Sequence, residues 1–348
     1  MSYLRKNIEQ MEGYSPGFQP KEAGFIKLNT NESPYPPSAR IVKAMRAACG
    51  ESIRKYPPPF AEPFRARAAE LFGTKPDCIL CGFGSDDILT IAVRALCGEG
   101  DLMAFPSPTY SLYGVLAQIQ NARAVALDFP EDYSLPPELA GTGARLTLLS
   151  NPNAPSGTMI AFEEVRQLAD ALDGVLLVDE AYVDFAEWNC LELAKTRPNV
   201  IVTRTLSKSH GLAGLRFGYA VAHEDLIAGM MKVKDSYNVS APALAGAVAA
   251  ISDQEWLRQN VERIRKTRTV LIEGLRRLRC HCWPSQANFV LARLPAGSDA
   301  EQVFNELFRR KILVRYFKAP RLDDCLRISV GTDEEIRALL DALREILG

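Results

Sequence analysis

The sequence predicts an α/β fold: a large domain with a mostly parallel seven-stranded sheet sandwiched by helices, and a smaller α+β domain. Three observations lead to this prediction. The chain has 348 residues, which is more than one simple core usually holds. Its central part alternates short apolar runs with segments of helical spacing, a pattern typical of a parallel sheet covered on both faces. Near residue 253 this alternation stops.

Seven apolar runs are the expected strands of the large domain, which is predicted to span residues 46–252. The predicted strands are 77–81, 101–105, 122–127, 145–150, 174–179, 199–204 and 217–222. Helical stretches such as 85–97 and 162–173 lie between several of them. The regular succession of strand and helix therefore predicts a single sheet with helices on both sides.

The smaller domain is predicted over residues 253–348. It begins with a long amphipathic segment, 254–279, in which apolar residues recur at helical spacing. Short expected strands follow at 288–294, 312–317 and 325–331. The last helix is expected to start at Thr332, which forms a capping-box pattern with Glu335. Residues 1–45 contain many turn formers and are expected to form an N-terminal arm and part of this smaller domain.

Composition and charge exclude several classes of partner. The formal net charge is -1 and the pI is about 6.4, so nothing indicates a nucleic-acid or membrane-surface partner, and the expected substrate is small. The N-terminus lacks the apolar region of a signal peptide, and no apolar run approaches the roughly 20 residues that span a bilayer. We therefore expect a cytoplasmic protein.

The eight cysteines do not indicate a metal site. Cys78 and Cys81 make a CxxC pair, but they lie in an expected strand, where residues i and i+3 point to opposite faces. Zinc would require such ligands on tight turns. Buried thiols in a reducing compartment are the preferred interpretation, and no bound metal is expected.

A glycine-rich turn, GFGSDD at 82–87, lies between an expected strand and an expected helix. Glycines let the backbone approach a ligand closely, and the start of a helix offers free N–H groups and a partial positive charge. This suits a phosphate, although a plain turn can have the same sequence. A dinucleotide-binding motif needs a third glycine where this chain has Asp87, which argues against an NAD-dependent dehydrogenase.

Two further motifs follow predicted strands. In VDEAY, Asp179 ends an apolar strand at the sheet edge where α/β proteins bind ligands, and Tyr182 comes three residues later. The loop NPNAPSG, 151–157, contains two prolines and a glycine, which favour one fixed conformation. Each motif also has an ordinary interpretation: a helix cap for Asp179 and a rigid connection for the loop.

Lys208 follows the apolar strand 199–204 and stands between two serines. A desolvated lysine has a depressed pKa and becomes a nucleophile able to form an imine with a carbonyl. Ser207 and Arg216 nearby suit a phosphate, because arginine presents a planar fork of donors. A lysine in a turn is usually just solvated, but this one accompanies a carboxylate, a tyrosine and a glycine-rich turn. Pyridoxal 5'-phosphate requires such a set, so the sequence predicts it as the cofactor.

The chain resembles the fold-type-I (class II) pyridoxal-phosphate-dependent aminotransferases, and within them the histidinol-phosphate aminotransferase family. The stretches that carry the resemblance are LNTNESPY, RKYP, GFGSDD, SPTY, NPNAPSG, DEAY, TLSKSHGLAGLRFGY and LRISVGT, and they extend over nearly the whole chain. The resemblance implies transamination of L-histidinol phosphate with 2-oxoglutarate, which gives imidazole acetol phosphate and L-glutamate in histidine biosynthesis.

The resemblance also implies roles in binding the cofactor. Lys208 is expected to attach it covalently and to transfer the proton, Asp179 to pair with its pyridine nitrogen, and Tyr182 to hydrogen-bond its phenolic oxygen. These three are the expected catalytic residues. Tyr110 is expected to stack on the ring. Ser207, Arg216 and the backbone of Ser85 and Asp86 are expected to hold the cofactor's phosphate, and Gly84 is a further expected cofactor-binding residue.

One position departs from the pattern of the family. The family commonly has an asparagine, in contact with the phenolic oxygen, where this chain has Ala154. Asn153 is the expected replacement, with Asn151 as the second choice.

For the substrate, the resemblance implicates arginines of the smaller domain. Arg327 matches the arginine that binds a substrate carboxylate, and its strand alternates so that the aliphatic residues face the core and Arg327 can face the site. Together with Arg315 it is expected to bind the substrate phosphate and the carboxylate of glutamate. Tyr14 and Tyr56 match tyrosines that contact the substrate phosphate, Tyr56 from the partner subunit, so a homodimer is expected. Tyr237 matches another pocket position.

Other functions on the same scaffold stay open. A threonine-phosphate decarboxylase would also need phosphate-binding arginines, and an aromatic amino-acid aminotransferase would need a roomy apolar pocket. A non-catalytic ligand sensor with this fold would stand behind a DNA-binding helix-turn-helix. The chain begins almost at the fold and has no basic patch, which argues against the sensor.

Overall fold

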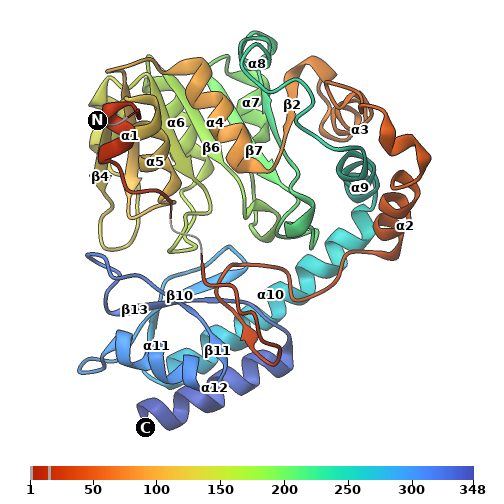
Figure 1. The fold of residues 1–348 in the computed structure, drawn as a ribbon. Helices are drawn as coiled ribbons and strands as arrows, with labels where there is room; N and C mark the ends of the chain where they lie inside the picture. Colours follow the sequence, from red (N-terminus) through yellow and green to blue (C-terminus); the bar gives the residue numbers. More distant parts are fainter. Residues whose placement is uncertain (1–2, 15–16) are drawn as a thin grey trace.

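The computed structural model describes residues 3–14 and 17–348. Figure 1 shows two parts, a larger one around a seven-stranded sheet and a smaller one around a four-stranded sheet. The long helix α10 (Gln254–Arg277) contacts strands β9 and β10 and helix α12 of the smaller part and a short turn, residues 183–185, of the larger one. The helix therefore packs against both parts and connects them.

The seven-stranded sheet has the order β2-β8-β7-β6-β5-β3-β4. Its strands are β2 (Ile79–Gly82), β3 (Leu102–Ser107), β4 (Arg123–Asp128), β5 (Leu146–Ser150), β6 (Val175–Asp179), β7 (Val200–Thr205) and β8 (Gly218–Ala222). Only β8 runs antiparallel to its neighbours, and the other adjacent pairs are parallel. The predicted mostly parallel seven-stranded sheet is confirmed.

Helices cover both faces of this sheet, as predicted. In β7, Ile201 packs into one buried cluster, whereas Val200 and Val202 pack into another on the opposite face. The first face is covered by α4 (Ser85–Leu96), α5 (Leu112–Gln120) and α8 (Glu224–Met231), and the second by α3 (Glu62–Phe72), α6 (Phe162–Ala171), α7 (Leu191–Thr196) and α9 (Ala241–Ser252). Strands buried on both faces explain the continuous apolar runs of the sequence.

The smaller part is an antiparallel sheet of order β12-β13-β10-β9 covered by helices. Its strands are β9 (His281–Cys282), β10 (Phe289–Arg293), β12 (Arg315–Tyr316) and β13 (Cys325–Ser329), and its helices besides α10 are α11 (Ala300–Arg309) and α12 (Asp333–Leu347). The predicted capping box at the start of α12 is confirmed: the Thr332 side chain accepts from Glu335 N, and Glu335 accepts from Thr332 N.

Two local predictions were wrong. The expected strand 312–317 divides at Val314 into β11 (Ile312–Leu313), which pairs with β1 (Ile26–Lys27), and β12, which pairs with β13. An apolar run does not reveal that the chain passes from one sheet to another. The strand containing the CxxC pair begins only at Ile79, because Cys78 lies in a short 3-10 turn. Within the described residues, no three His, Cys, Asp or Glu side chains gather to hold a metal ion.

The N-terminal segment contacts both parts. Strand β1 pairs with β11 of the smaller part, helix α2 (Ala39–Ala48) packs on α9, and helix α1 (Lys6–Gln10) packs on α5. Asp253 lies between α9 and α10, at the expected start of the smaller domain. The domain limits at 45 and 252 stay predictions. In the part of the chain that the structure describes, no helix is both long and apolar enough to cross a bilayer.

Candidate active site

The candidate site lies where five strands of the large sheet end. β3, β5, β6 and β7 are mutually parallel, and β2 has the same direction because β8 runs against both β2 and β7. Their carboxyl ends therefore share one edge of the sheet. The segments that follow them are 82–87, 107–110, 151–157, 179–182 and 205–208. All the motifs singled out in the large domain follow these strands, as ligand-binding residues of α/β sheets do.

Asp179 ends β6 as a buried carboxylate with neutral neighbours. Its Oδ2 accepts a hydrogen bond from the Tyr113 hydroxyl at 3.0 Å, and its Oδ1 accepts from Thr203 Oγ1 and Ala181 N, both at 3.2 Å. Burial raises the pKa of Asp179 to about 6, although the hydrogen bond from Tyr113 opposes the rise. No described lysine, arginine or histidine forms an ion pair with it. The carboxylate is oriented by hydroxyls but not neutralised, so a cationic ligand group would satisfy it.

Tyr182 and Lys208 lie beside one another above the sheet edge. The Tyr182 hydroxyl accepts a hydrogen bond from Asn31 Nδ2 at 3.1 Å. The Lys208 ammonium lies 5.6 Å from the centre of the Tyr182 ring and donates to the Thr30 carbonyl at 3.4 Å. Among the described residues no carboxylate lies within ion-pair distance of Lys208. The Lys208 nitrogen thus lies near the site and forms no ion pair with a described residue.

The glycine-rich turn and Arg216 form a compact anion cradle. Gly84 precedes α4 with φ +86, and a Cβ built there would approach Arg216 Nη2 to 2.6 Å. Arg216 itself reaches Asp86 Oδ2 and Ser207 Oγ, both at 3.4 Å. Gly218 must also be glycine, because a Cβ there would lie 2.4 Å from Ser85 N. Hydroxyl, guanidinium and helix-start N–H groups therefore converge in the manner that binds phosphate.

Tyr110 lies over the same cradle. Its hydroxyl donates to Asp86 Oδ1 at 3.1 Å, and its ring makes edge contacts with Tyr14 and Tyr113, with ring centres 6.1 and 5.8 Å away. Burial, reinforced by the carboxylate of Asp86, raises the pKa of the Tyr110 phenol. The phenol therefore stays neutral and its ring can stack on a flat ligand.

Asn153 uses its amide to connect its own loop to the segment 107–110. Its Nδ2 donates to Pro108 O at 3.2 Å and to Ser156 Oγ at 2.9 Å, while its Oδ1 accepts from Thr109 Oγ1 at 2.8 Å. Asn151 is similarly occupied by the backbone of Ile160. A contact from Asn153 to the cofactor stays a prediction, and the loop contacts by themselves explain why both asparagines are buried.

Arg315 and Arg327 face each other across β12 and β13 as directly paired residues. Their side chains share one face of the sheet, and both guanidiniums lie against the Phe317 ring, 5.2 and 5.4 Å from its centre. Neither has an ion pair with a described residue, and Arg327 Nε is buried without an acceptor there. Burial lowers the pKa of Arg327 despite the opposing effect of the Tyr182 phenol. Two adjacent cations without acidic partners among the described residues have the charge to match a dianion.

The remaining predicted tyrosines gather in two places. Tyr14 lies against Tyr110 and so belongs to the site. Tyr56 stacks on Tyr237 of the same chain, with ring centres 4.3 Å apart, and both are exposed, Tyr56 to 79%. Neither has a described contact with Arg315 or Arg327. Tyr56 and Tyr237 instead form an exposed aromatic pair. Asn238, the residue after Tyr237, donates a hydrogen bond to Asp87 of the glycine-rich turn, so the pair lies near that turn.

A second buried carboxylate stands next to Asp179 but has a different environment. Glu180 accepts from Arg204 Nε at 2.9 Å and forms an ion pair with its Nη2 at 2.7 Å. The Cys190 N–H also donates to Glu180. Burial opposes the charge of Arg204, but the carboxylate of Glu180 raises the pKa of Arg204. The two charges neutralise one another within the chain.

Sequence reasoning missed two residues of the site. Tyr113 donates to Asp179, and its position three residues after Tyr110 at the start of a helix was a usable signal. Asn31 donates to Tyr182, and it lies in LNTNESPY, one of the stretches that carry the family resemblance. Neither contact follows from local sequence, because each joins segments far apart in the chain.

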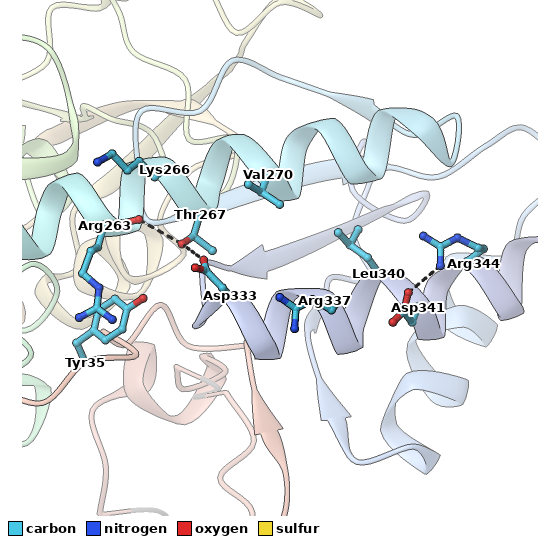
Figure 2. Close-up of a pocket in the computed structure, with 10 residues that line it drawn as sticks. All are labelled: Tyr35, Arg263, Lys266, Thr267, Val270, Asp333, Arg337, Leu340, Asp341 and Arg344. Atoms are coloured by element: carbon cyan, nitrogen blue, oxygen red, sulfur yellow. Dashed lines mark hydrogen bonds and ion pairs between the residues drawn. The ribbon is translucent and has the colours of Figure 1, made fainter.

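A well-formed cavity lies away from these residues. Figure 2 shows it between α10 and α12, with a volume of about 430 Å³. Several of its polar groups have partners: Thr267 donates to Asp333, Arg344 pairs with Asp341, and the Arg263 guanidinium lies 3.7 Å from the centre of the Tyr35 ring. None of the predicted site residues lines this cavity, so volume alone does not identify the site.

The comparisons with known proteins agree with this geometry. The family model for aminotransferase class I and II matches residues 23–343. The chain is 44% identical to histidinol-phosphate aminotransferase 1 of Nostoc sp., over 99% of this chain and 98% of the relative. It is 45% identical to histidinol-phosphate aminotransferase of Syntrophotalea carbinolica, over 99% of this chain and the whole of the relative.

Solved structures give the same result. The histidinol-phosphate aminotransferase of Sinorhizobium meliloti, in complex with pyridoxal-5'-phosphate, superposes with a TM-score of 0.91 and 28% identity, over 100% of this chain and 98% of that chain. An aspartate aminotransferase of Thermus thermophilus shares the fold at a TM-score of 0.85 with 20% identity, over 99% of this chain and 100% of that chain. The chain therefore belongs to the class I and II aminotransferases and, within them, to the histidinol-phosphate aminotransferase family.

Proposed function

We propose that this protein uses pyridoxal phosphate to transfer the amino group of L-histidinol phosphate to 2-oxoglutarate, giving imidazole acetol phosphate and L-glutamate. The observation that carries the choice of substrate is the pair Arg315 and Arg327, adjacent on one sheet face and without acidic partners among the described residues. A phosphate dianion would match both guanidiniums, and a carboxylate could bind in the same place. The relatives' name supports the same substrate.

The residues of the candidate site fit the cofactor. Asp179 is a buried carboxylate without a cation, which suits a protonated pyridine nitrogen. Lys208 is a nearby amine without a carboxylate partner in the described chain. Gly84, Ser207 and Arg216 form a cradle in which a Cβ at Gly84 would collide with the guanidinium. Bound there, pyridoxal phosphate would supply an electron-withdrawing ring through which an amino group passes between two carbon skeletons.

The chain's own residues would then have separate tasks. Lys208 would hold the cofactor covalently and, as a free amine, move a proton at the substrate carbon. Asp179 would keep the ring nitrogen charged, with Tyr113 and Thr203 fixing the carboxylate. Tyr182 would donate to the phenolic oxygen. Binding and proton transfer are thus divided between neighbouring strand ends of one sheet.

The cradle and the aromatic residues would position the two ligands. The cofactor's phosphate would bind the backbone of Ser85 and Asp86 together with Ser207 and Arg216, and Tyr110 would stack on its ring. The substrate's phosphate would bind between the arginines with help from Tyr14. Asn153 would also contact the cofactor. Its amide has three hydrogen-bond partners in the protein, which hold its loop in place.

A homodimer is part of the proposal. Further exposed apolar side chains lie close to Tyr56 in the sequence and in the glycine-rich turn, as expected of a surface that another chain covers. They include Ile53, Phe60 and Phe83, which are 56%, 46% and 54% exposed. Tyr56 would reach the site of the partner, and Tyr237 would line its own. We further propose a cytoplasmic location, which subcellular fractionation would test.

A single-turnover experiment tests the function. Protein loaded with pyridoxal phosphate is mixed with L-histidinol phosphate in the absence of a keto acid, and then with phenylalanine and with threonine phosphate. We expect the visible band of the bound cofactor to disappear fastest with L-histidinol phosphate. Faster loss with phenylalanine would instead indicate an aromatic aminotransferase. Release of carbon dioxide from threonine phosphate without a keto acid would indicate a decarboxylase.

A further inference from the structure

The segment Asn29–Thr30–Asn31 touches three site residues in succession. The Asn29 carbonyl accepts from Arg327 at 3.0 Å, the Thr30 carbonyl accepts from Lys208 at 3.4 Å, and the Asn31 amide donates to Tyr182 at 3.1 Å. The first two contacts use the backbone, which any residue provides. Only Asn31 contributes a side chain, and it is the one residue of the segment whose replacement removes its contact.

The orientation of the Asn31 amide is fixed by Ser329. The Asn31 N–H donates to Ser329 Oγ at 2.8 Å, and the Ser329 hydroxyl lies 2.9 Å from Asn31 Oδ1. Because the serine oxygen accepts from the backbone N–H, its single proton is available for Oδ1. Oδ1 is therefore the acceptor and Nδ2 the donor, so the group that faces Tyr182 is an N–H.

The backbone of Asn31 is held as firmly as its side chain. Its φ is +56, in the left-handed region that asparagine tolerates better than most residues. Its carbonyl accepts from Asn288 Nδ2 at 3.0 Å, and only 1% of the residue is exposed. Ser329 and Asn288 both belong to the smaller domain, whereas Tyr182 belongs to the large one. Asn31 is thus a rigid bridge between them.

The hydrogen bond from Asn31 restricts the direction of the Tyr182 hydroxyl proton. A phenol has one proton to donate, and its oxygen accepts from the Asn31 amide. The phenolic proton is then directed to another acceptor. Among the described residues the Tyr182 hydroxyl has no other hydrogen-bonding side-chain partner, and Ala154 of the neighbouring loop, a member of the same buried cluster, has no polar side-chain group. The remaining direction is the site itself.

We propose that Asn31 is a positioning residue that acts through Tyr182: its amide holds the phenol so that the phenolic proton is donated to an anionic oxygen of the bound cofactor. The inference rests on the proposed function, since it requires pyridoxal phosphate in the site. Loss of a donor makes that oxygen more basic, and a proton shared with the adjacent nitrogen is then held more tightly. The pH midpoint of the cofactor's visible absorption reports this proton directly.

The test is a pH titration of the visible band in holoenzyme variants. Asn31→Gly removes the amide and suits the positive φ, and Asn31→Asp keeps the size and the acceptor for Ser329 but removes the donor. We expect each to raise the midpoint by roughly 0.5 to 1 pH unit, a threefold to tenfold change in proton affinity. Tyr182→Phe should raise it at least as much. Asn29→Ala is the matched control, because its equally buried amide donates to Phe18 and not to Tyr182.

A double-mutant cycle separates positioning from a general structural effect. If Asn31 acts through the phenol, Asn31→Gly should leave the midpoint unchanged in the Tyr182→Phe background. The same shift in both backgrounds, or no shift in Asn31→Gly where Tyr182→Phe shifts the midpoint, would overturn the inference and leave the proposed function intact. Protein that acquires no visible band with pyridoxal phosphate would overturn the proposed function, and this inference with it.

Discussion

Two sets of carboxylate and guanidinium groups in this protein have the same chemistry and opposite arrangements. Glu180 and Arg204 face each other at 2.7 Å and neutralise one another inside the large domain. Asp179 and Arg327 have no partner of opposite charge among the described residues, and hydroxyls or a backbone carbonyl orient them instead. Asp179 and Glu180 are consecutive in the chain and are 3% and 1% exposed. Burial therefore does not distinguish the functional carboxylate from the structural one; the missing countercharge does.

The difference has a physical cause. A buried charge left without a partner costs several kcal/mol, and a ligand of opposite charge that completes the pair offsets this cost. Asp179 lies at the carboxyl end of β6, and the neighbouring side chain alternates to the opposite side, toward Arg204 of β7. In the proposed function, Asp179 would face the cationic group of the bound ligands, and Arg327 and Arg315 would face an anionic group.

The largest effect is expected from Lys208→Ala, which removes the unmatched amine. Activity should fall by about 10⁴-fold or more, because one group supplies both the covalent attachment and the proton transfer. Steady-state amino transfer measures the loss, and thermal denaturation should show little change in stability. Lys195→Ala, which removes a lysine paired with Glu192 at 2.7 Å, is the control. Wild-type turnover in the Lys208 variant would show that the amine is not the attachment point.

Breaking the matched pair should instead cost stability. Glu180→Gln leaves the Arg204 guanidinium buried without a carboxylate, and the free energy of unfolding should drop by about 3 to 5 kcal/mol. The folded fraction should keep activity within a few-fold of wild type, because the pair faces away from the ligand space. Urea denaturation and activity per folded molecule are the two measurements. Loss of activity with unchanged stability would mean that Glu180 belongs to the site.

Removing an unmatched guanidinium should reduce substrate binding. Arg327→Ala is expected to lower kcat/KM by about 10²–10³-fold for both the phosphorylated amine and glutamate, the cost of a lost charge pair in a partly buried site. Arg293→Ala is the matched control, since this arginine of the same sheet has Glu131 and Asp324 as partners. A loss for only one of the two substrates would assign the other to Arg315.

The sequence predicted the fold and the strand-end motifs well, because both are local. Apolar runs buried on two faces identify the strands of a parallel sheet, and Asp179 and Lys208 could be recognised by their positions directly after such runs. The bridge from Asn31 to Tyr182 could not be predicted, since it joins residues 151 positions apart. Nor could the division at Val314, where one apolar run serves two sheets.

The smallest effect is a pH dependence of stability that originates in the unmatched Asp179. Its pKa in the folded, cofactor-free protein is raised to about 6 by burial, whereas an unfolded aspartate has about 3.9. Between these values the folded state binds more protons than the unfolded state, so the stability contributed by this group falls as pH rises through that range. The two pKa values differ by about 2 units, which limits the loss of stability to roughly 3 kcal/mol.

The variant Asp179→Asn cannot ionise and should lack this component of the pH dependence. Urea denaturation of the cofactor-free protein at pH 4.5 and pH 7.5 should therefore show a smaller decrease in stability for the variant. A cationic ligand group at Asp179 would favour the carboxylate and reduce the difference, so repeating the measurement with pyridoxal phosphate should bring the two proteins' pH dependences closer together. Equal decreases for wild type and variant without the cofactor would mean that Asp179 is already neutralised within the chain, and the contrast with Glu180 would then fail.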